Sequence, residues 1–140
     1  MSNPMKLFIG ALLFIQLFPV AACSGSPALA QHISTEVISV EVWRGGDDGL
    51  TSKLADALEE KFRQTSPFVV GPASERPSLV VTIPSNVKWK KVGTRTKVQF
   101  YVTFSRSSRQ IGISKGACWE EDMPRCAAII VADARKIALR

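Results

Sequence analysis

Residues 96–105 read TKVQFYVTFS, and this stretch decides the fold. Every second side chain in it is apolar: Val98, Phe100, Val102 and Phe104. The side chains between them are polar or carry a hydroxyl group: Lys97, Gln99, Tyr101 and Thr103. A repeat of two residues places the two sets on opposite faces of a β-strand. The stretch therefore predicts one long strand with an apolar face that a second layer must cover.

Strand patterns also occur on both sides of this stretch. We expect strands over residues 35–43, 68–70, 79–83 and 110–114, and the strand at 79–83 is expected to resume after Pro84 over residues 87–91. Short turns between successive strands are typical of an antiparallel sheet. The sequence thus predicts an antiparallel meander with one apolar face and one polar face.

Two helices are predicted. Apolar residues recur at every fourth position from Leu50 to Phe62, which predicts a helix over residues 49–64. A second apolar stripe predicts a helix over residues 124–139 that begins at a proline. Two such helices can cover the apolar face of the meander. The predicted fold class is therefore α+β, a two-layer sandwich in the order β-α-β-β-β-β-α, formed by a single domain over residues 33–140.

The N-terminal residues have the pattern of an export signal. Lys6 precedes an apolar run over residues 7–20, and small residues follow the run. The run is short for a membrane span, since a span needs roughly 20 residues. The sequence predicts a signal peptide over residues 1–22 and a flexible tether over residues 23–32.

The end of this signal resembles the lipobox of bacterial lipoproteins. The string Val20-Ala21-Ala22-Cys23 has the aliphatic and small residues that precede the modified cysteine in that family. The resemblance implies that Cys23 carries lipid, including palmitate, and anchors the chain to a bacterial membrane. Ser24 after it implies the outer membrane, with the domain facing the periplasm. Cleavage after Ala30, at the A-x-A string Ala28-Leu29-Ala30, is the alternative and would release a soluble periplasmic or secreted protein.

The chain contains three cysteines. Lipidation uses Cys23 and cleavage after Ala30 removes it, so either route leaves Cys118 and Cys126. A pair of cysteines in a small exported domain is typical of a disulfide bond. Two separate buried thiols are the alternative. A metal site is disfavoured because two cysteines and the distant His32 do not supply four ligands.

Basic residues are unevenly spread along a chain whose formal net charge is +6 at pH 7. No Asp or Glu occurs from Arg76 to Trp119, a stretch that holds nine Lys or Arg residues. Strand parity places much of this charge on the polar face of the meander. We expect an anion-binding surface made by Lys88, Lys90, Arg95, Lys97 and Tyr101.

The partner of this surface is predicted from charge and compartment together. Phospholipid or lipopolysaccharide head groups, cell-wall carboxylates and acidic proteins are the anionic partners that an envelope protein meets. Nucleic acid fits the charge but not the predicted compartment. The alternative is that the basic residues only solvate the strands and blunt their edges.

No catalytic, metal-binding or cofactor-binding residues are predicted. His32 lies in the tether, which does not position an imidazole for catalysis. Asp47 and Asp48 lack the ligand spacing of a calcium loop, and we interpret them as caps of the first helix. Residues 120–122, which are all acidic, precede the second helix and are expected to stabilise its dipole rather than to act as acid–base catalysts.

The three tryptophans also have two readings. Trp43, Trp89 and Trp119 are expected to pack inside or half inside the core, and the alternative is that they line a groove.

Three functions remain in view. The first is a non-enzymatic envelope lipoprotein that acts as a binding or assembly module through its basic sheet face. The second is a soluble secreted domain, an inhibitor or accessory subunit that adds a sheet edge to its partner. The third, a small hydrolase, requires a cleft that contains Glu120 or Asp47.

Overall fold

The computed structural model describes residues 36–71 and 78–140. The predicted signal peptide, Cys23, the two predicted cleavage sites and the predicted tether lie outside these residues. The elements in chain order are β1 (Ile38–Arg44), α1 (Gly49–Arg63), β2 (Phe68–Val70), β3 (Ser78–Ile83), β4 (Lys88–Val92), β5 (Arg95–Arg106), β6 (Arg109–Trp119), the short 3-10 helix η1 (Glu120–Asp122) and α2 (Met123–Ala138).

The sheet is mixed, which corrects the prediction of an antiparallel meander. β1 pairs in parallel with β2 and with β3, whereas β3, β4 and β6 pair antiparallel with β5. The parallel pairing of β1 with β2 follows from α1, because a chain that leaves β1 through a helix returns to the end of the sheet where β1 began. A pattern of period two indicates a strand but not its direction, so sequence reasoning alone missed this.

β3 and β4 lie along the same edge of β5 and are separated by residues 84–87. β3 pairs with residues 103–105 and β4 with residues 95–99, while β6 occupies the other edge of β5. The strand predicted to resume after Pro84 is therefore two strands, and the order has one strand more than predicted. Residues 100–102 of β5 have neither a β3 nor a β4 partner in the register of the described strands.

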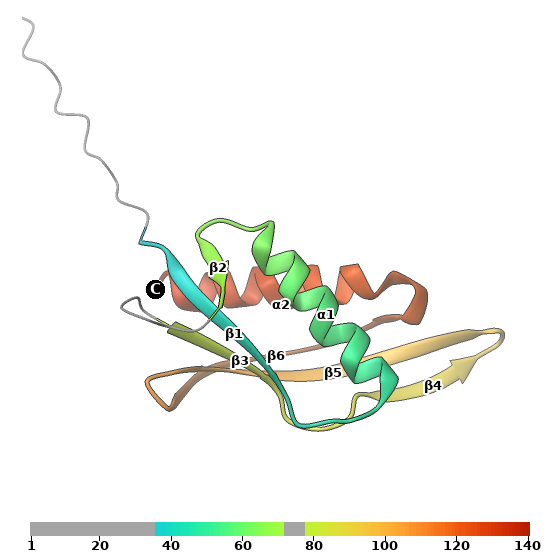
Figure 1. Cartoon of the computed structure of the whole chain (residues 1–140). Coiled ribbons are helices and arrows are strands. Elements are labelled where there is room, and N and C mark those ends of the chain that lie inside the picture. Colours follow the sequence, from blue (N-terminus) through green and yellow to red (C-terminus); the bar gives the residue numbers. More distant parts are fainter. Residues whose placement is uncertain (1–35, 72–77) are drawn as a thin grey trace, which may run out of the picture. The chain divides into compact units, whose positions relative to one another are not determined.

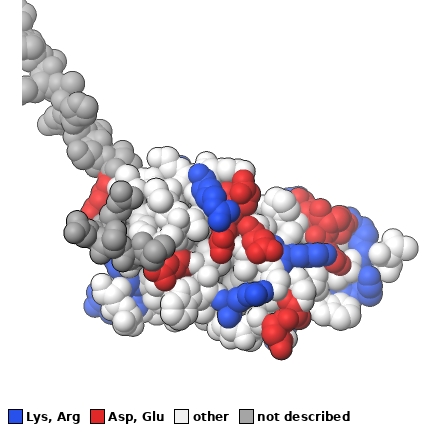
Figure 2. All heavy atoms as spheres, in the orientation of Figure 1, with Lys and Arg blue, Asp and Glu red and all other residues white. Residues whose placement is uncertain are grey.

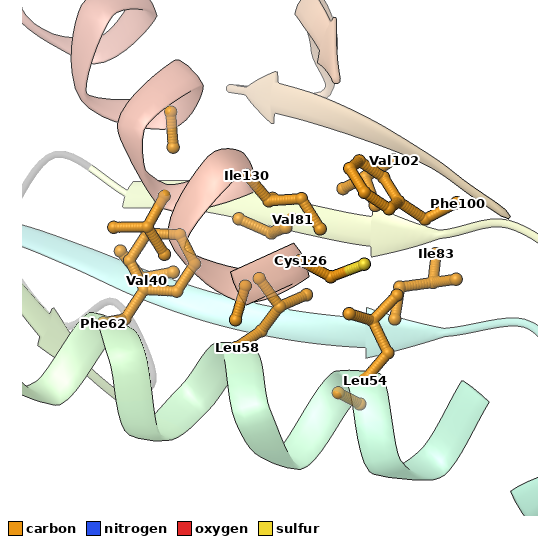
Figure 3. Packing of buried hydrophobic residues seen from close by; sticks show 14 of the residues in the cluster. Val40, Leu54, Leu58, Phe62, Val81, Ile83, Phe100, Val102, Cys126 and Ile130 are labelled. Atoms are coloured by element: carbon orange, nitrogen blue, oxygen red, sulfur yellow. The ribbon is translucent and has the colours of Figure 1, made fainter. Parts of the chain in front are cut away.

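Both helices cover one face of the sheet, so the prediction of a two-layer α+β fold is confirmed (Figure 1). The core lies between the layers, and Figure 3 shows side chains from α1, α2 and the strands meeting there. The residues labelled in that figure are Val40, Leu54, Leu58, Phe62, Val81, Ile83, Phe100, Val102, Cys126 and Ile130. None of the helices in residues 36–71 and 78–140 is long and apolar enough to cross a membrane.

α1 begins at a side-chain cap that also holds the start of β4. The Asp48 carboxylate accepts the backbone N–H of Thr51 at 2.7 Å and the Thr51 hydroxyl at 3.0 Å. The Thr51 hydroxyl oxygen in turn accepts the buried backbone N–H of Val87 at 3.0 Å. The capping role predicted for Asp48 is confirmed. Asp47 does not cap the helix; its backbone N–H donates to the Asn86 side chain at 2.9 Å.

β6 is longer than predicted and ends at the cysteine that joins it to α2. A disulfide connects Cys118 near the end of β6 to Cys126 in the first turn of α2, which confirms the predicted pair. The core side of β6 carries Gly112 and Gly116, which leave room for the side chains of Ile137 and Phe100. Because glycines stand where apolar residues would alternate, the strand predicted from the sequence ends at Ser114.

Candidate anion-binding face

The side of the sheet that carries no helix holds the predicted basic residues. On β5, Lys97 and Tyr101 alternate with Val98, Phe100 and Val102, which are buried under the helices. The register places side chains of β4 and β6 beside them on the same side. We call this set the basic face: Lys88, Lys90, Arg95, Lys97, Tyr101 and Lys115.

Two lysines of the basic face lie directly opposite each other. Lys90 of β4 is the register partner of Lys97 of β5. Like charges opposite each other in a sheet are destabilising. Neither ammonium group forms an ion pair with a carboxylate of the described residues. An anion bound between them would relieve this repulsion.

A hollow of about 260 Å³ opens on the basic face where β3 gives way to β4. Lys88 and Lys115 line it together with Gln99 and Tyr101. Lys88 is the register partner of Gln99, and Tyr101 is that of Lys115. The hollow thus offers two ammonium groups, an amide and a phenol hydroxyl, all of which can donate hydrogen bonds to an oxyanion.

The turn after β1 packs against residues 84–87, the break between β3 and β4 that forms this hollow. The backbone N–H of Gly45 donates to the carbonyl of Ile83 at 2.7 Å. A Cβ atom on Gly45 would collide with the carbonyl oxygen of Pro84, and one on Gly46 would collide with Asn86. Only glycine lets the two turns approach this closely. The break between β3 and β4 is therefore a packed feature of the fold.

Arg95 lies on the basic face, but its charge already has a partner. Its guanidinium group pairs with the Glu121 carboxylate and stacks over the Trp119 ring at 4.0 Å from the ring centre. Of the five residues predicted to bind an anion, Arg95 is thus the least available. Its contacts tie the start of β5 to η1.

Sequence reasoning missed Lys115 and two aromatic residues of the open side. Lys115 follows the point where the predicted last strand stopped. Trp43 and Trp119 lie on the open side with Tyr101, where one aromatic residue was expected. The prediction that the tryptophans pack in or half in the core is wrong for two of them, since Trp43 is 59% and Trp89 is 58% exposed.

The acidic residues between β6 and α2 are held ionised by basic partners. The Lys53 ammonium group donates to the Glu120 carboxylate at 2.9 Å and, with the Thr96 hydroxyl, lowers the pKa of Glu120. A hydrogen bond from its own backbone N–H and the Arg95 guanidinium lower the pKa of Glu121. These carboxylates join η1 to α1 and to the β4–β5 hairpin.

Acid is therefore expected to weaken the domain through these two carboxylates. Because their folded-state pKa values lie below the ordinary 4.5, the stability they contribute is present above that pH and is lost as pH falls through the lowered values. Titration of the Glu120 carboxyl carbon by NMR should give a pKa below 4.5, and the pKa should rise in Lys53→Met. An unchanged Glu120 titration in that variant would contradict the assignment.

The face of the molecule that carries α1 shows mixed charge. In the view of Figure 2, which looks onto α1, acidic and basic side chains are interspersed. Within residues 36–71 and 78–140, no three His, Cys, Asp or Glu side chains lie close enough to hold a metal ion.

Comparisons with known proteins do not assign a family. No family model and no curated protein matches the chain. Among solved structures, protein XCC0632 of Xanthomonas campestris, from family DUF330, aligns with a TM-score of 0.47 and 10% identity over 74% of this chain and 92% of its own. A PelC dodecamer of Paraburkholderia phytofirmans aligns with a TM-score of 0.44 and 12% identity over 71% and 83%.

A third structure, hypothetical protein CT253 of Chlamydia trachomatis, aligns with a TM-score of 0.35 and 7% identity over 60% of this chain and 72% of its own. Scores and identities this low support no conclusion about function, partner or assembly.

Proposed function

We propose that this protein is a non-enzymatic cell-envelope lipoprotein that acts as a binding or assembly module. Its basic face would bind an anionic envelope component or an acidic protein. The observation that carries the proposal is the pair Lys90 and Lys97, which lie opposite each other with no acidic partner among the described residues. A bound anion would convert this repulsion into attraction.

The compartment is supported by the disulfide. Bonds such as Cys118–Cys126 persist in oxidising compartments and are rare in the reducing cytosol. The lipobox resemblance adds the anchor at Cys23, with the outer membrane favoured and the domain facing the periplasm.

Charge reversal tests the basic face. In the full chain, Lys88→Glu, Lys90→Glu and Lys97→Glu together are expected to weaken binding to immobilised dextran sulfate at low salt by roughly tenfold or more, because three attractions become repulsions. The matched control reverses Arg109, Arg125 and Arg135, which are exposed and lie outside the basic face. Equal losses in both triple variants would show that net charge alone drives binding.

Lipid labelling tests the anchor. Cells supplied with labelled palmitate should incorporate label into the full chain and not into Cys23→Ser. A mature protein of unlabelled mass that begins at Gln31 would instead support the soluble alternative. That alternative is an inhibitor or accessory subunit that adds a sheet edge, and the outer edge of β6, which has β5 as its one strand partner among the described residues, suits it.

A further inference from the structure

The β4–β5 hairpin extends beyond the helices (Figure 1). All five residues of β4 are exposed. Two of them are large and apolar: Trp89, which is 58% exposed, and Val92, which is 45% exposed. Five basic residues and no acidic residue occur over residues 88–97, which form β4, the turn around Gly93 and the first three residues of β5. The hairpin therefore presents cationic and apolar groups together, outside the packed core.

Both sides of the hairpin carry these groups. Lys90 is the register partner of Lys97 and lies on the open side with Lys88 and Val92. Trp89 is the register partner of the buried Val98, so it lies on the helix side, where it is 58% exposed. Lys91 lies on the same side, and its ammonium group donates to the Thr96 hydroxyl at 2.9 Å. A protein partner that packs against one side of the sheet would cover only one of these two sets. A layer of lipid head groups receives side chains from both sides of a strand that lies in it.

β4 also has a free edge. β5 is the one strand partner of β4 among the described residues, so the backbone N–H and C=O groups of its outer edge remain available. Such groups are not tolerated in the hydrocarbon of a bilayer but are satisfied by water and phosphate at its surface. Tryptophan prefers this depth, and lysines beside it extend toward anionic head groups.

We infer that the outer edge of β4 docks on an anionic bilayer surface, with Trp89 at the level of the head groups and Lys88, Lys90 and Lys91 around it. The inference rests on the proposed function and specifies its partner, an anionic phospholipid surface. A soluble polyanion would use the lysines but leave Trp89 and Val92 in water.

Two single-tryptophan versions of the full chain test the contact. One keeps Trp89 and carries Trp43→Phe and Trp119→Phe; the other keeps Trp43 and carries Trp89→Phe and Trp119→Phe. Trp43 is the matched control because it is as exposed as Trp89 but lies on β1. Each chain is incorporated into vesicles whose lipids carry bromine near the head group, made of phosphatidylcholine alone or mixed equally with phosphatidylglycerol.

The expected result is quenching and a blue shift of Trp89 emission in the phosphatidylglycerol vesicles only, with little change for Trp43 in either. Because any anchor is present in both chains, it does not produce this difference. Trp89 emission that matches Trp43 in both vesicles, or that is quenched equally in neutral and anionic vesicles, would overturn the inference.

Charge neutralisation gives a second readout. Adding Lys88→Gln, Lys90→Gln and Lys91→Gln to the Trp89 chain should reduce the docking equilibrium roughly a hundredfold, since three basic side chains leave an anionic surface. Arg109→Gln, Arg125→Gln and Arg135→Gln remove the same charge elsewhere and should leave the quenching intact. Equal losses in the two sets would overturn the role of β4.

The two proposals fail separately. If Trp89 stays unquenched while binding to dextran sulfate still depends on Lys88, Lys90 and Lys97, membrane docking is wrong and an acidic protein or polysaccharide is the partner. If dextran sulfate binding is also indifferent to those lysines, the anion-binding function is wrong as well.

Discussion

Replacing Phe62 with alanine is expected to lower the free energy of unfolding by about 3–5 kcal/mol. Phe62 is fully buried in the last turn of α1, and its ring meets the Phe68 ring edge to face with 5.1 Å between ring centres. Truncation removes the apolar contacts of the ring, leaves a cavity between α1 and β2, and abolishes the aromatic pair. Because β2 has just three residues and pairs with β1 over them, we expect this contact to help hold it in the sheet.

Urea unfolding followed by circular dichroism measures this loss. Phe62→Leu should cost less than Phe62→Ala, because leucine keeps most of the buried volume. Val69→Ala is the neighbouring surface control, since Val69 is 45% exposed, and should change stability by about 0.5 kcal/mol or less. A loss below about 1 kcal/mol for Phe62→Ala would contradict the packing described for α1 and β2.

The local structure of this chain follows from its sequence more closely than its topology does. The helix predicted over residues 49–64 is α1, Gly49–Arg63, and the helix predicted over 124–139 is α2, Met123–Ala138. Both have strong apolar stripes and clear N-terminal signals, which are the Asp48 cap of α1 and Pro124 in the first turn of α2. Such signals are local, so one sequence suffices to read them.

Strand direction and register are not local. The parallel pairing of β1 with β2 and with β3 depends on where the chain re-enters the sheet after α1 and again after β2, and no residue of these strands encodes that choice by itself. The strand predicted over residues 110–114 is shorter than β6, Arg109–Trp119, for a different reason. On the core side of β6, Ile137 of α2 packs against Gly112 and Phe100 of β5 packs against Gly116. The strand therefore lacks the alternating apolar residues that would indicate it in the sequence.

Part of the candidate site can be predicted from the sequence, because the alternation of side chains along one strand is a local signal. Parity along β5 was enough to place Lys97 and Tyr101 on the open side. The opposition of Lys90 and Lys97 needed the hairpin register, and the hollow between Lys88 and Lys115 needed the break at residues 84–87. Arg95 is predicted as part of the anion-binding surface, and its ion pair with Glu121, 26 residues further along the chain, is not visible in the strand pattern.

The break between β3 and β4 links the fold to the proposed function. An unbroken strand would pair with β5 along its whole length and fill the hollow. The glycines of the turn after β1 keep the break open from one side, and Thr51, which accepts the Val87 N–H, fixes where β4 begins. The same break separates β4 from β3, and the β4–β5 hairpin extends beyond the helices (Figure 1).

Removing the disulfide through Cys118→Ser and Cys126→Ser is expected to lower the free energy of unfolding by about 2.5 kcal/mol. The bond closes a loop with a sequence separation of 8, and loss of this closure restores conformational entropy to the unfolded chain. Cys126 is completely buried, so a serine there also places a hydroxyl among apolar side chains. The stability of η1 should fall too, since the closed loop contains its three residues.

Reduction of the natural chain separates these effects. Thermal unfolding with and without a reducing agent should show a lower midpoint for the reduced natural protein and no change for Cys118→Ser, Cys126→Ser. Cys118→Ala, Cys126→Ala removes the bond without adding buried hydroxyls and should match the reduced protein within about 1 kcal/mol. The natural protein could instead keep the same thermal midpoint after its two thiols have been shown to be free. That result would mean that the packing of α2 on β6 holds the loop without the disulfide. Because η1 holds the start of β5 through Glu121 and Arg95, reduction should also loosen the hairpin on which both proposals depend.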